Sequence, residues 1–397
     1  MKHIYVIGLD EFNEKRLEEL EGAENWQFHS LISFSEAHGE GFGPFEKLRK
    51  LGEKRLSEAE FEPDAIISWW DYPSTCLGAW LKQKANMPGA SLNNVIKCEH
   101  KYWSRCEQQK VIPDNIPNFQ ALNPFADDPL DQLELSFPFW IKPVKSVGSR
   151  LAMSVSNEKE FQNAIKKIRE TIHRYGDPFN EALQHVDLPE DIKHVDGLWC
   201  IVEKGIAAGD QCTLSGFVHN GQVHNYGIVD SINYTHVSSF FRYEYPSRLP
   251  EKVQERIYDL GTKVMQQLEY DNQAFNIEFF YDKGDDQLWL LEVNPRISQS
   301  HAECYKRVDG MSNLKIVVEL GLGQRPDVPH RQGDAKVSAL GFFRHFCDGV
   351  VKKAPSEEDI EHVQEQVSDS IILWDAPEGT RLSDLPGPRP MRFSSSS

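Results

Sequence analysis

An otherwise apolar run, residues 288–303 (LWLLEVNPRISQSHAE), carries polar side chains at every second position: Glu292, Asn294 and Arg296. Because side chains alternate between the faces of a β-strand, these three groups are predicted to point the same way. Glu278 precedes Glu292 across the turn sequence KGDD, so a hairpin would bring the two carboxylates together. Adjacent carboxylates repel unless a cation lies between them, and Mg²⁺ prefers oxygen ligands. The pattern predicts a metal site of Glu278, Glu292 and Asn294 faced by Arg296; the alternative is the polar face of an amphipathic hairpin.

Two lysines and a loop of small residues form a second set of candidates. In FWIKPVKSVGSRLAMSV, Lys142 lies on a predicted strand, and the loop that follows contains Ser146, Gly148 and Ser149. The backbone amides of such a loop can surround phosphate oxygens, although a plain β-hairpin turn is the alternative. Lys101 lies on a predicted helix, either as a phosphate ligand or as one more exposed lysine.

A third set lies in the sequence WWDYPS, directly after the predicted buried strand DAIISWW. Ligands bind at the carboxyl ends of strands in open parallel sheets, so Asp71 and Tyr72 are candidate substrate contacts. In the alternative interpretation, Ser74 caps the next helix and Asp71 is a solvated turn residue.

Composition limits the class of protein that can carry these residues. The chain has 397 residues, with 43 basic and 61 acidic side chains and a formal net charge of −18, which excludes nonspecific binding to nucleic acid. No window approaches the roughly 18 consecutive apolar residues of a membrane span, and the start lacks the apolar region of a signal peptide, so we expect a soluble cytoplasmic protein. Seven scattered cysteines without a C-x-x-C pair suggest neither a disulfide framework nor a zinc cluster.

The elements that must position these residues follow from hydrophobic periodicity. Strands alternate with helices over residues 1–90, which predicts an open parallel βαβ domain. A second domain is expected at residues 91–325, followed by an α+β subdomain at 326–397 with a disordered tail. The N-G pair in QCTLSGFVHNGQVHNYGIV predicts a hairpin turn, and the polar stretch GDPFNEALQHVDLPEDIKHVDG is expected to be an exposed excursion.

In chain order these features are a helix lysine, a strand lysine with its Gly/Ser loop, an apolar strand ending at Glu203, and a carboxylate hairpin ending in N-P-R. This order resembles the ATP-grasp superfamily over residues 90–325. The N-P-R-x-S-x-S form is especially similar to carbamoyl phosphate synthetase and biotin carboxylase relatives, and to L-amino acid ligases. The resemblance implies an α/β (α+β) chain with an ATP-grasp fold, in which residues 130–205 form a small lid subdomain over the nucleotide.

The resemblance also implies roles in nucleotide binding. Lys101 and Lys142 would hold the phosphates of ATP, with the loop from Ser146 to Ser149 folded over them. Adenine would lie on the linker from Glu203 to Ile206, which includes Lys204.

Gln211 occupies a position where family members commonly have a ribose-binding glutamate, a departure expected to weaken discrimination rather than binding. Glu278, Glu292 and Asn294 would hold one or two Mg²⁺ ions, or Mn²⁺. Arg296 would stabilise the transferring group, and Lys142 would share this catalytic role.

Candidate substrate contacts are less sharply defined. Arg242 can clamp a carboxylate or pair with Glu244, and His301 is either a substrate contact or a structural histidine. Ser298 lies in the segment that replaces the glycine-rich continuation of dipeptide-forming ligases, so the acyl acceptor stays open.

The expected activity is an ATP- and Mg²⁺-dependent carboxylate–amine ligase that forms an amide or peptide bond through an acyl phosphate. A carboxylate is a poor electrophile until it is phosphorylated, and phosphoryl transfer needs charge neutralisation and positioning rather than a protein nucleophile. The alternatives are bicarbonate activation through carboxyphosphate and an ATP-binding sensor without turnover. Small carboxylates and amines are the expected partners, and a homodimer is one expected state.

Overall fold

The computed structural model describes residues 1–39, 43–148, 150–206, 209–235, 239–367, 370–374 and 376–382. The chain divides into two compact units, Met1–Gly341 and Phe342–Ser397. All the predicted site residues belong to the first unit.

The chain begins with a parallel sheet of three strands, β1 (Lys2–Leu9), β2 (Trp26–Ser33) and β3 (Ala65–Ser68), in the order β2-β1-β3. The β-branched residues of β1 and β3 are buried, which explains why both strands read as continuous apolar runs. The predicted open parallel βαβ start is therefore confirmed. Because WWDYPS follows β3 directly, Asp71 lies at the carboxyl end of the sheet.

Helices flank this sheet and lead into the next part of the chain. They are α1 (Glu11–Glu18), η1 (Ala23–Asn25), α2 (Phe34–His38), α3 (Phe45–Ser57), α4 (Ser74–Lys84), α5 (Leu92–Glu99), α6 (Lys101–Val111) and η2 (Pro113–Asn115). The ring Nδ1 of His100 accepts a hydrogen bond from Trp103 N at 3.1 Å and so caps α6. This cap places Lys101 in the first turn of α6.

An antiparallel sheet of four strands follows: β4 (Phe119–Leu122), β5 (Phe139–Pro143), β6 (Met153–Val155) and β7 (Cys200–Lys204), in the order β4-β7-β5-β6. In the sequence, the short η3 (Leu130–Gln132) falls between β4 and β5, and the helix α7 (Glu158–Thr171) falls between β6 and β7. Phe161, Ile165 and Ile168 recur at helical spacing on α7 and pack against the strands in one apolar cluster.

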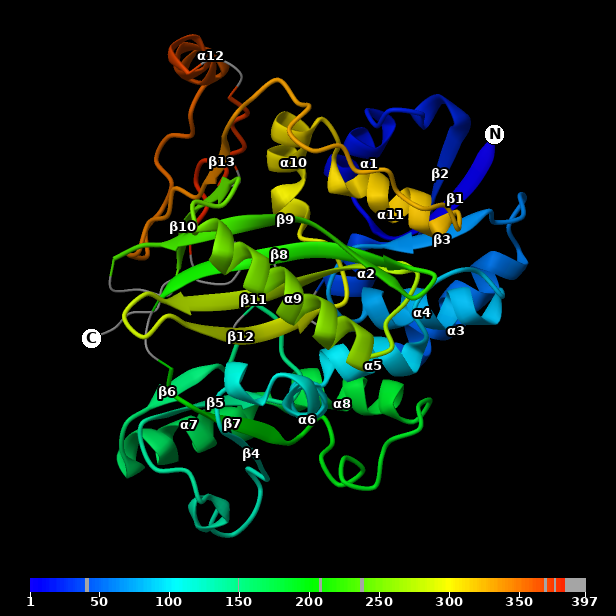
Figure 1. Cartoon of the computed structure of the whole chain (residues 1–397). Helices are drawn as coiled ribbons and strands as arrows, with labels where there is room; N and C mark the ends of the chain where they lie inside the picture. Colours follow the sequence, from blue (N-terminus) through cyan, green and yellow to red (C-terminus); the bar gives the residue numbers. More distant parts are fainter. Residues whose placement is uncertain are drawn as a thin grey trace. The chain divides into compact units, whose positions relative to one another are not determined.

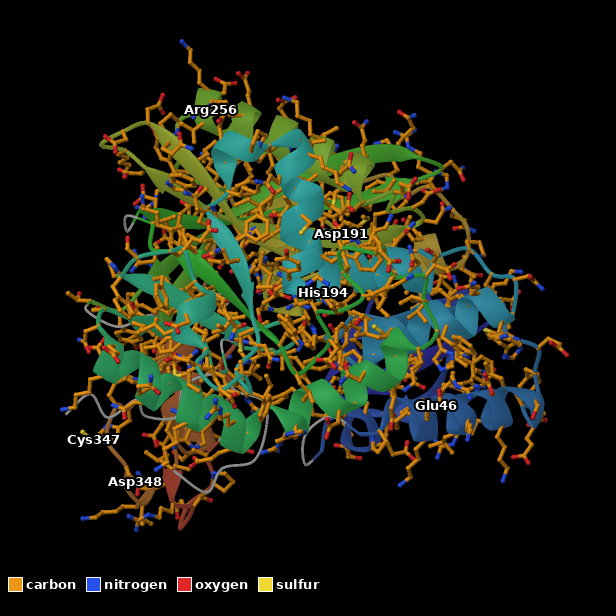
Figure 2. The ribbon with its side chains drawn as sticks, turned by 90° about the horizontal axis from the view of Figure 1, so that it is seen from below. Glu46, Asp191, His194, Arg256, Cys347 and Asp348 are labelled. Carbon is orange, nitrogen blue, oxygen red and sulfur yellow. The ribbon has the colours of Figure 1, made fainter. Side chains whose placement is uncertain are left out.

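The prediction that residues 176–197 form an exposed excursion is wrong. Their first part belongs to α8 (His173–Leu183), which buries Phe179, and the later Ile192 and Val195 are also buried. Pro178 and the surrounding polar residues concealed the helical spacing of the apolar positions. In Figure 2, α8 runs beside α3 at Glu46, whose backbone N–H donates to the Glu181 carboxylate at 3.0 Å.

The largest sheet has six antiparallel strands: β8 (Asp210–His219), β9 (Gln222–Asn233), β10 (Phe240–Tyr245), β11 (Gln273–Asp282), β12 (Gln287–Asn294) and β13 (Ser338–Gly341). Their order is β12-β11-β8-β9-β10-β13. The helix α9 (Glu251–Gln267) crosses one face of this sheet (Figure 1). Asn220 and Gly221 join β8 to β9 with positive φ values of 50° and 75°, which confirms the predicted N-G hairpin turn.

The hairpin of β11 and β12 leads into η4 (Gln299–His301), α10 (Ala302–Asp309) and α11 (Asn313–Gly321). Because β13 pairs with β10, the first unit extends beyond residue 326, where the sequence places the start of the last subdomain. The second unit contains α12 (Glu357–Gln366) and a bridge between Val350 and Arg381. Across the described ranges, none of the helices combines the length and the apolar character that crossing a membrane requires.

Candidate active site

Two carboxylates face each other in the β11–β12 hairpin, as the sequence predicts. Glu278 and Glu292 are direct cross-strand partners, and the next pair on the same face of the hairpin is Asn276 with Asn294. Partners of this kind have Cβ atoms about 5 Å apart, so their side chains share one place on the sheet. Asn294 Nδ2 donates to Asn276 Oδ1 at 3.1 Å, which leaves Asn294 Oδ1 directed elsewhere.

The electrostatics of this pair fit a bound cation. Burial and the neighbouring Glu292 raise the pKa of Glu278 to about 7. A divalent cation bound to oxygen ligands would offset the repulsion between the two carboxylates and favour their charged forms. Among the described residues, no three His, Cys, Asp or Glu side chains gather as a metal cluster, so a third protein ligand would have to be neutral, as Asn294 is.

Lys101 reaches Glu292 from the first turn of α6. Its Nζ forms an ion pair with Glu292 Oε1 and lies 3.4 Å from the backbone oxygen of Ser146. Burial opposes the charged ammonium, but Glu292 outweighs it and raises the pKa of Lys101. The predicted helix lysine is therefore a charged neighbour of Glu292 whose side chain is only 16% exposed, and not a freely exposed surface residue.

Lys142 projects from β5 to Glu203 on the neighbouring β7. Its Nζ lies 2.5 Å from Glu203 Oε2, and Arg105 Nε lies 2.6 Å from Glu203 Oε1. Burial acts to raise the pKa of Glu203, but the two cations outweigh it and lower the pKa to about 2. Arg105 also donates to the backbone oxygen of Leu291 at 2.7 Å, so it ties the four-stranded sheet to β12.

The loop between β5 and β6 lies next to these lysines. Ser146 is 5% exposed, and Gly148 has φ of 58°, a conformation that glycine adopts without strain. Ser149 lies outside the described residues. Beyond β7, Lys204 is exposed and Ile206 is partly exposed. The backbone of Lys204 donates to Asn118 O at 2.8 Å, which fixes the start of the linker predicted to receive adenine.

Gln211, predicted to contact ribose, lies beside the carboxylate pair. Its Nε2 donates to Glu278 Oε2 at 3.2 Å, and its Oε1 accepts from Asn233 Nδ2 at 3.4 Å. Both ends of the amide are engaged, which orients the Glu278 carboxylate within the hairpin.

Arg296 connects the hairpin to the carboxyl end of the first sheet. Its Nε lies 2.6 Å from Asp71 Oδ1, and an Nη atom lies 3.5 Å from Asn294 Oδ1. Burial acts to raise the pKa of Asp71, while Arg296 lowers it below its ordinary value. The structure thus brings together Asp71, Arg296 and the carboxylate hairpin, which are far apart in sequence.

The other substrate candidates differ in accessibility. Tyr72 is fully buried and its hydroxyl donates to Pro178 O at 2.5 Å, so it is a core residue rather than an accessible substrate contact. Arg242 is paired with Glu244, which was the alternative left open by the sequence. Ser298 is partly exposed, and its carbonyl accepts from Asn313 Nδ2 at 2.9 Å.

His301 is buried against aromatic rings. It is 1% exposed and packs edge-on against Tyr243, with ring centroids 4.7 Å apart. Burial and the nearby Arg296 charge lower the pKa of His301 to about 3, so the imidazole is neutral at physiological pH. This burial favours a structural histidine, and the ring Nδ1 has no hydrogen-bond partner among the described residues.

Sequence reasoning missed a buried ion pair beneath the loop. Lys145 pairs with Glu99 of α5, and Thr75 Oγ1 donates to the same carboxylate at 2.5 Å. Lys145 and Glu99 are 3% and 5% exposed, and the cation also lies near Asp71 and Glu292. The second lysine in KPVKS was the available signal, because it lies three residues after Lys142.

Comparison with known proteins agrees with this geometry. Residues 135–303 match the ATP-grasp domain family. The carbamoyl phosphate synthase large chain of Clavibacter michiganensis is 31% identical over 108 residues, which is 27% of this chain and 10% of that protein. The match therefore spans about a tenth of the length of this curated relative.

Similar solved structures extend the likeness over the whole fold. The L-amino acid ligase from Bacillus licheniformis has a TM-score of 0.72 at 16% identity, covering 96% of this chain and 89% of that one. Biotin carboxylase from Campylobacter jejuni has a TM-score of 0.58 at 18% identity, covering 83% of this chain and 73% of that one. Residues 135–303 thus resemble the ATP-grasp domain family, and the fold of the chain is similar to those of the L-amino acid ligase and of biotin carboxylase.

Proposed function

We propose that this protein is an ATP- and Mg²⁺-dependent carboxylate–amine ligase that releases ADP and phosphate. One observation supports the proposal: the side-chain oxygens of Glu278, Glu292 and Asn294 lie on one face of the hairpin. The cation of Lys101 contacts Glu292 there, and that of Arg296 lies beside Asn294. Phosphoryl transfer needs this combination, because a metal ion and fixed cations neutralise the charge that spreads over the phosphate oxygens.

The residues of the site have separate tasks in the proposed reaction. Lys101 and Lys142 would bind phosphate oxygens, each leaving the carboxylate that now pairs with it. Glu278, Glu292 and Asn294 would hold a divalent cation, which would supply Lewis acidity toward the phosphate oxygens. Arg296 would stabilise the charge of the transferring phosphoryl group, and Asp71 would hold the guanidinium in place.

The reaction balances without a covalent enzyme intermediate. A carboxylate oxygen of the acid attacks the γ-phosphorus of ATP and ADP leaves. The amine nitrogen then attacks the acyl carbon of the acyl phosphate, phosphate leaves, and the nitrogen loses a proton. The likeness to the L-amino acid ligase fold supports an amino acid or another small acid as the substrate class.

A second candidate function is activation of bicarbonate through carboxyphosphate. The similarity of 108 residues to carbamoyl phosphate synthase large chains favours it. Both functions use the same nucleotide and metal residues, and they differ in the acid that is phosphorylated.

The test is ADP release from Mg²⁺ and ATP with single acids, with acid and amine pairs, and with bicarbonate. ADP formation that requires both an acid and an amine supports the ligase, whereas stimulation by bicarbonate alone supports the second candidate. ATP binding without turnover across a broad panel contradicts both and indicates a sensor. The Glu292→Gln variant serves as the inactive control in every reaction.

A further inference from the structure

Three side-chain amides hold the backbone of the turn that carries Arg296. Gln273 Nε2 donates to Pro295 O at 3.1 Å, Asn276 Nδ2 donates to Arg296 O at 2.9 Å, and Asn313 Nδ2 donates to Ser298 O at 2.9 Å. The turn also makes backbone bonds of its own, from Arg296 N to Asn294 O at 2.8 Å and from His301 N to Ser298 O at 3.1 Å, and the three amides attach it to the neighbouring elements.

The first of these amides, that of Gln273, also contacts a buried lysine. Lys82 of α4 is 5% exposed, and its Nζ donates to Gln273 Oε1 at 3.2 Å. No carboxylate pairs with Lys82 in the part of the chain that the structure describes, and burial alone lowers its pKa to about 8. A side chain at position 89 would come within 2.6 Å of Lys82 Cδ, so Gly89 leaves the space that the lysine stem occupies.

The chemistry of the two neighbours determines how Gln273 is oriented. An ammonium can only donate hydrogen bonds, and a backbone carbonyl can only accept them. The oxygen of Gln273 must therefore face Lys82, and its NH₂ group must face Pro295. Lys82 and Arg296 also line the same small cavity, together with Gln273, Ser68 and Ile297.

We propose that Gln273, oriented by Lys82, is a positioning residue that fixes the main chain before Arg296 and thereby places the guanidinium for the reaction. A buried, unpaired lysine is costly, so its presence here calls for a compensating role. Asp71 holds the guanidinium of Arg296. The hydrogen bonds from Lys82 to Gln273 and from Gln273 to Pro295 O, here called the Lys82–Gln273–Pro295 relay, hold the backbone that precedes it. The catalytic part of this inference rests on the proposed ligase function, whereas the positioning part concerns the fold alone.

Gln273→Glu separates positioning from stability. The carboxylate keeps an acceptor for Lys82 and gains an ion pair with it, but it has no donor for Pro295 O and repels that carbonyl. We expect kcat for ADP formation to fall about ten-fold or more with the ATP KM little changed, because small displacements of a positioned group act on the transition state. The thermal midpoint should stay at or above that of the wild type.

Gln254→Glu is the matched control. Gln254 on α9 also donates to a backbone carbonyl, Leu249 O, at 2.7 Å, but it contacts none of the site residues. It should lose the same kind of bond and keep wild-type kcat. Amide hydrogen exchange gives a readout without turnover: the amides of residues 296–301 should exchange faster in Gln273→Glu and at the wild-type rate in Gln254→Glu.

The outcomes distinguish this inference from the proposed function. Wild-type exchange at residues 296–301 in Gln273→Glu overturns the positioning role, and so does wild-type kcat. If the wild-type protein forms no ADP with any substrate, the proposed function fails while the exchange experiment still decides the relay. If Gln273→Glu does not fold, Lys82→Met replaces it: releasing the amide should lower kcat a few-fold at unchanged ATP KM, and unchanged kcat contradicts the relay.

Discussion

Arg296 Nε lies 2.6 Å from Asp71 Oδ1, which joins the turn after β12 to the carboxyl end of the first parallel sheet. The two residues are 225 positions apart in the chain. A charge-assisted hydrogen bond between partly buried groups is short and directional, so it fixes the guanidinium relative to both sheets. The site is thus assembled across two sheets, and its geometry depends on how they pack within the first unit.

Replacement of Arg296 by alanine should impair the chemical step. If the guanidinium stabilises charge in the transition state, kcat should fall about 100-fold or more while the ATP KM changes only a few-fold. Steady-state ADP release measures both constants. Arg256→Ala is the control, because Arg256 on α9 is 41% exposed and pairs with Asp286 in the turn between β11 and β12. A raised ATP KM with unchanged kcat would mean that Arg296 only binds substrate.

The carboxylate pair should be needed for Mg²⁺ binding. Glu292→Gln removes a charge that a divalent cation requires, so ADP formation should disappear while the fold remains intact. Glu278→Gln removes the other charge, and the rise in thermal midpoint that Mg²⁺ and a nonhydrolysable ATP analogue produce should vanish with it. The exposed Glu255 on α9 supplies the control, since Glu255→Gln should retain the rise. A full Mg²⁺ effect in Glu278→Gln would remove this residue from the metal site.

The sequence predicts the hairpin site well because the relevant signals are local. Alternation at Glu292, Asn294 and Arg296, together with the turn KGDD, is enough to place Glu278 opposite Glu292. The parallel start and the N-G turn follow from equally local patterns.

Partners that are distant in the chain are not predictable in this way. Nothing near Asp71 in the sequence indicates Arg296, and nothing near Lys82 indicates Gln273, because tertiary packing decides both pairs. Tyr72 is an error of the same origin. An aromatic residue at a strand end suggests a contact with a ligand, but α8 packs over Tyr72 and its hydroxyl donates to Pro178 O. The concealed helical spacing of α8 is therefore the main reason for that error.

Lys82→Met should raise stability in a pH-dependent way. Burial lowers the pKa of Lys82 from 10.5 to about 8, so the folded protein loses this proton at lower pH than the unfolded chain. Below pH 8 both states hold the proton, and the folded state bears the full cost of burying it, about 3 kcal/mol for a shift of this size. Between pH 8 and 10.5 the unfolded chain binds more protons, so wild-type stability rises with pH. The variant's advantage in urea unfolding should therefore be largest near pH 7 and shrink toward pH 10; an advantage independent of pH would contradict the charged, buried lysine.

Glu203→Gln should destabilise the fold more than loss of an exposed ion pair. Glu203 is 4% exposed and accepts from both Arg105 and Lys142, so the change leaves two cations without their carboxylate. Removing one partner of a buried pair typically costs about 3 kcal/mol or more, which urea unfolding at pH 7 would measure. The pKa of Glu203 is lowered to about 2, so its contribution is present above the ordinary glutamate pKa of 4.5 and is lost as pH falls from 4.5 toward 2. Wild type and variant should converge in stability over that range.

The matched control for Glu203 is Glu190→Gln. Glu190 pairs with Lys193 at the surface, where its side chain is 90% exposed, and water screens the interaction. This variant should unfold at the same urea concentration as the wild type at every pH. If Glu203→Gln behaves like Glu190→Gln, then water or another acceptor compensates Arg105, and the buried triad does not hold the four-stranded sheet against β12. If instead Glu203→Gln alone is destabilised and the loss disappears at acid pH, the carboxylate is the group that joins α6, β5 and β7 around Lys142.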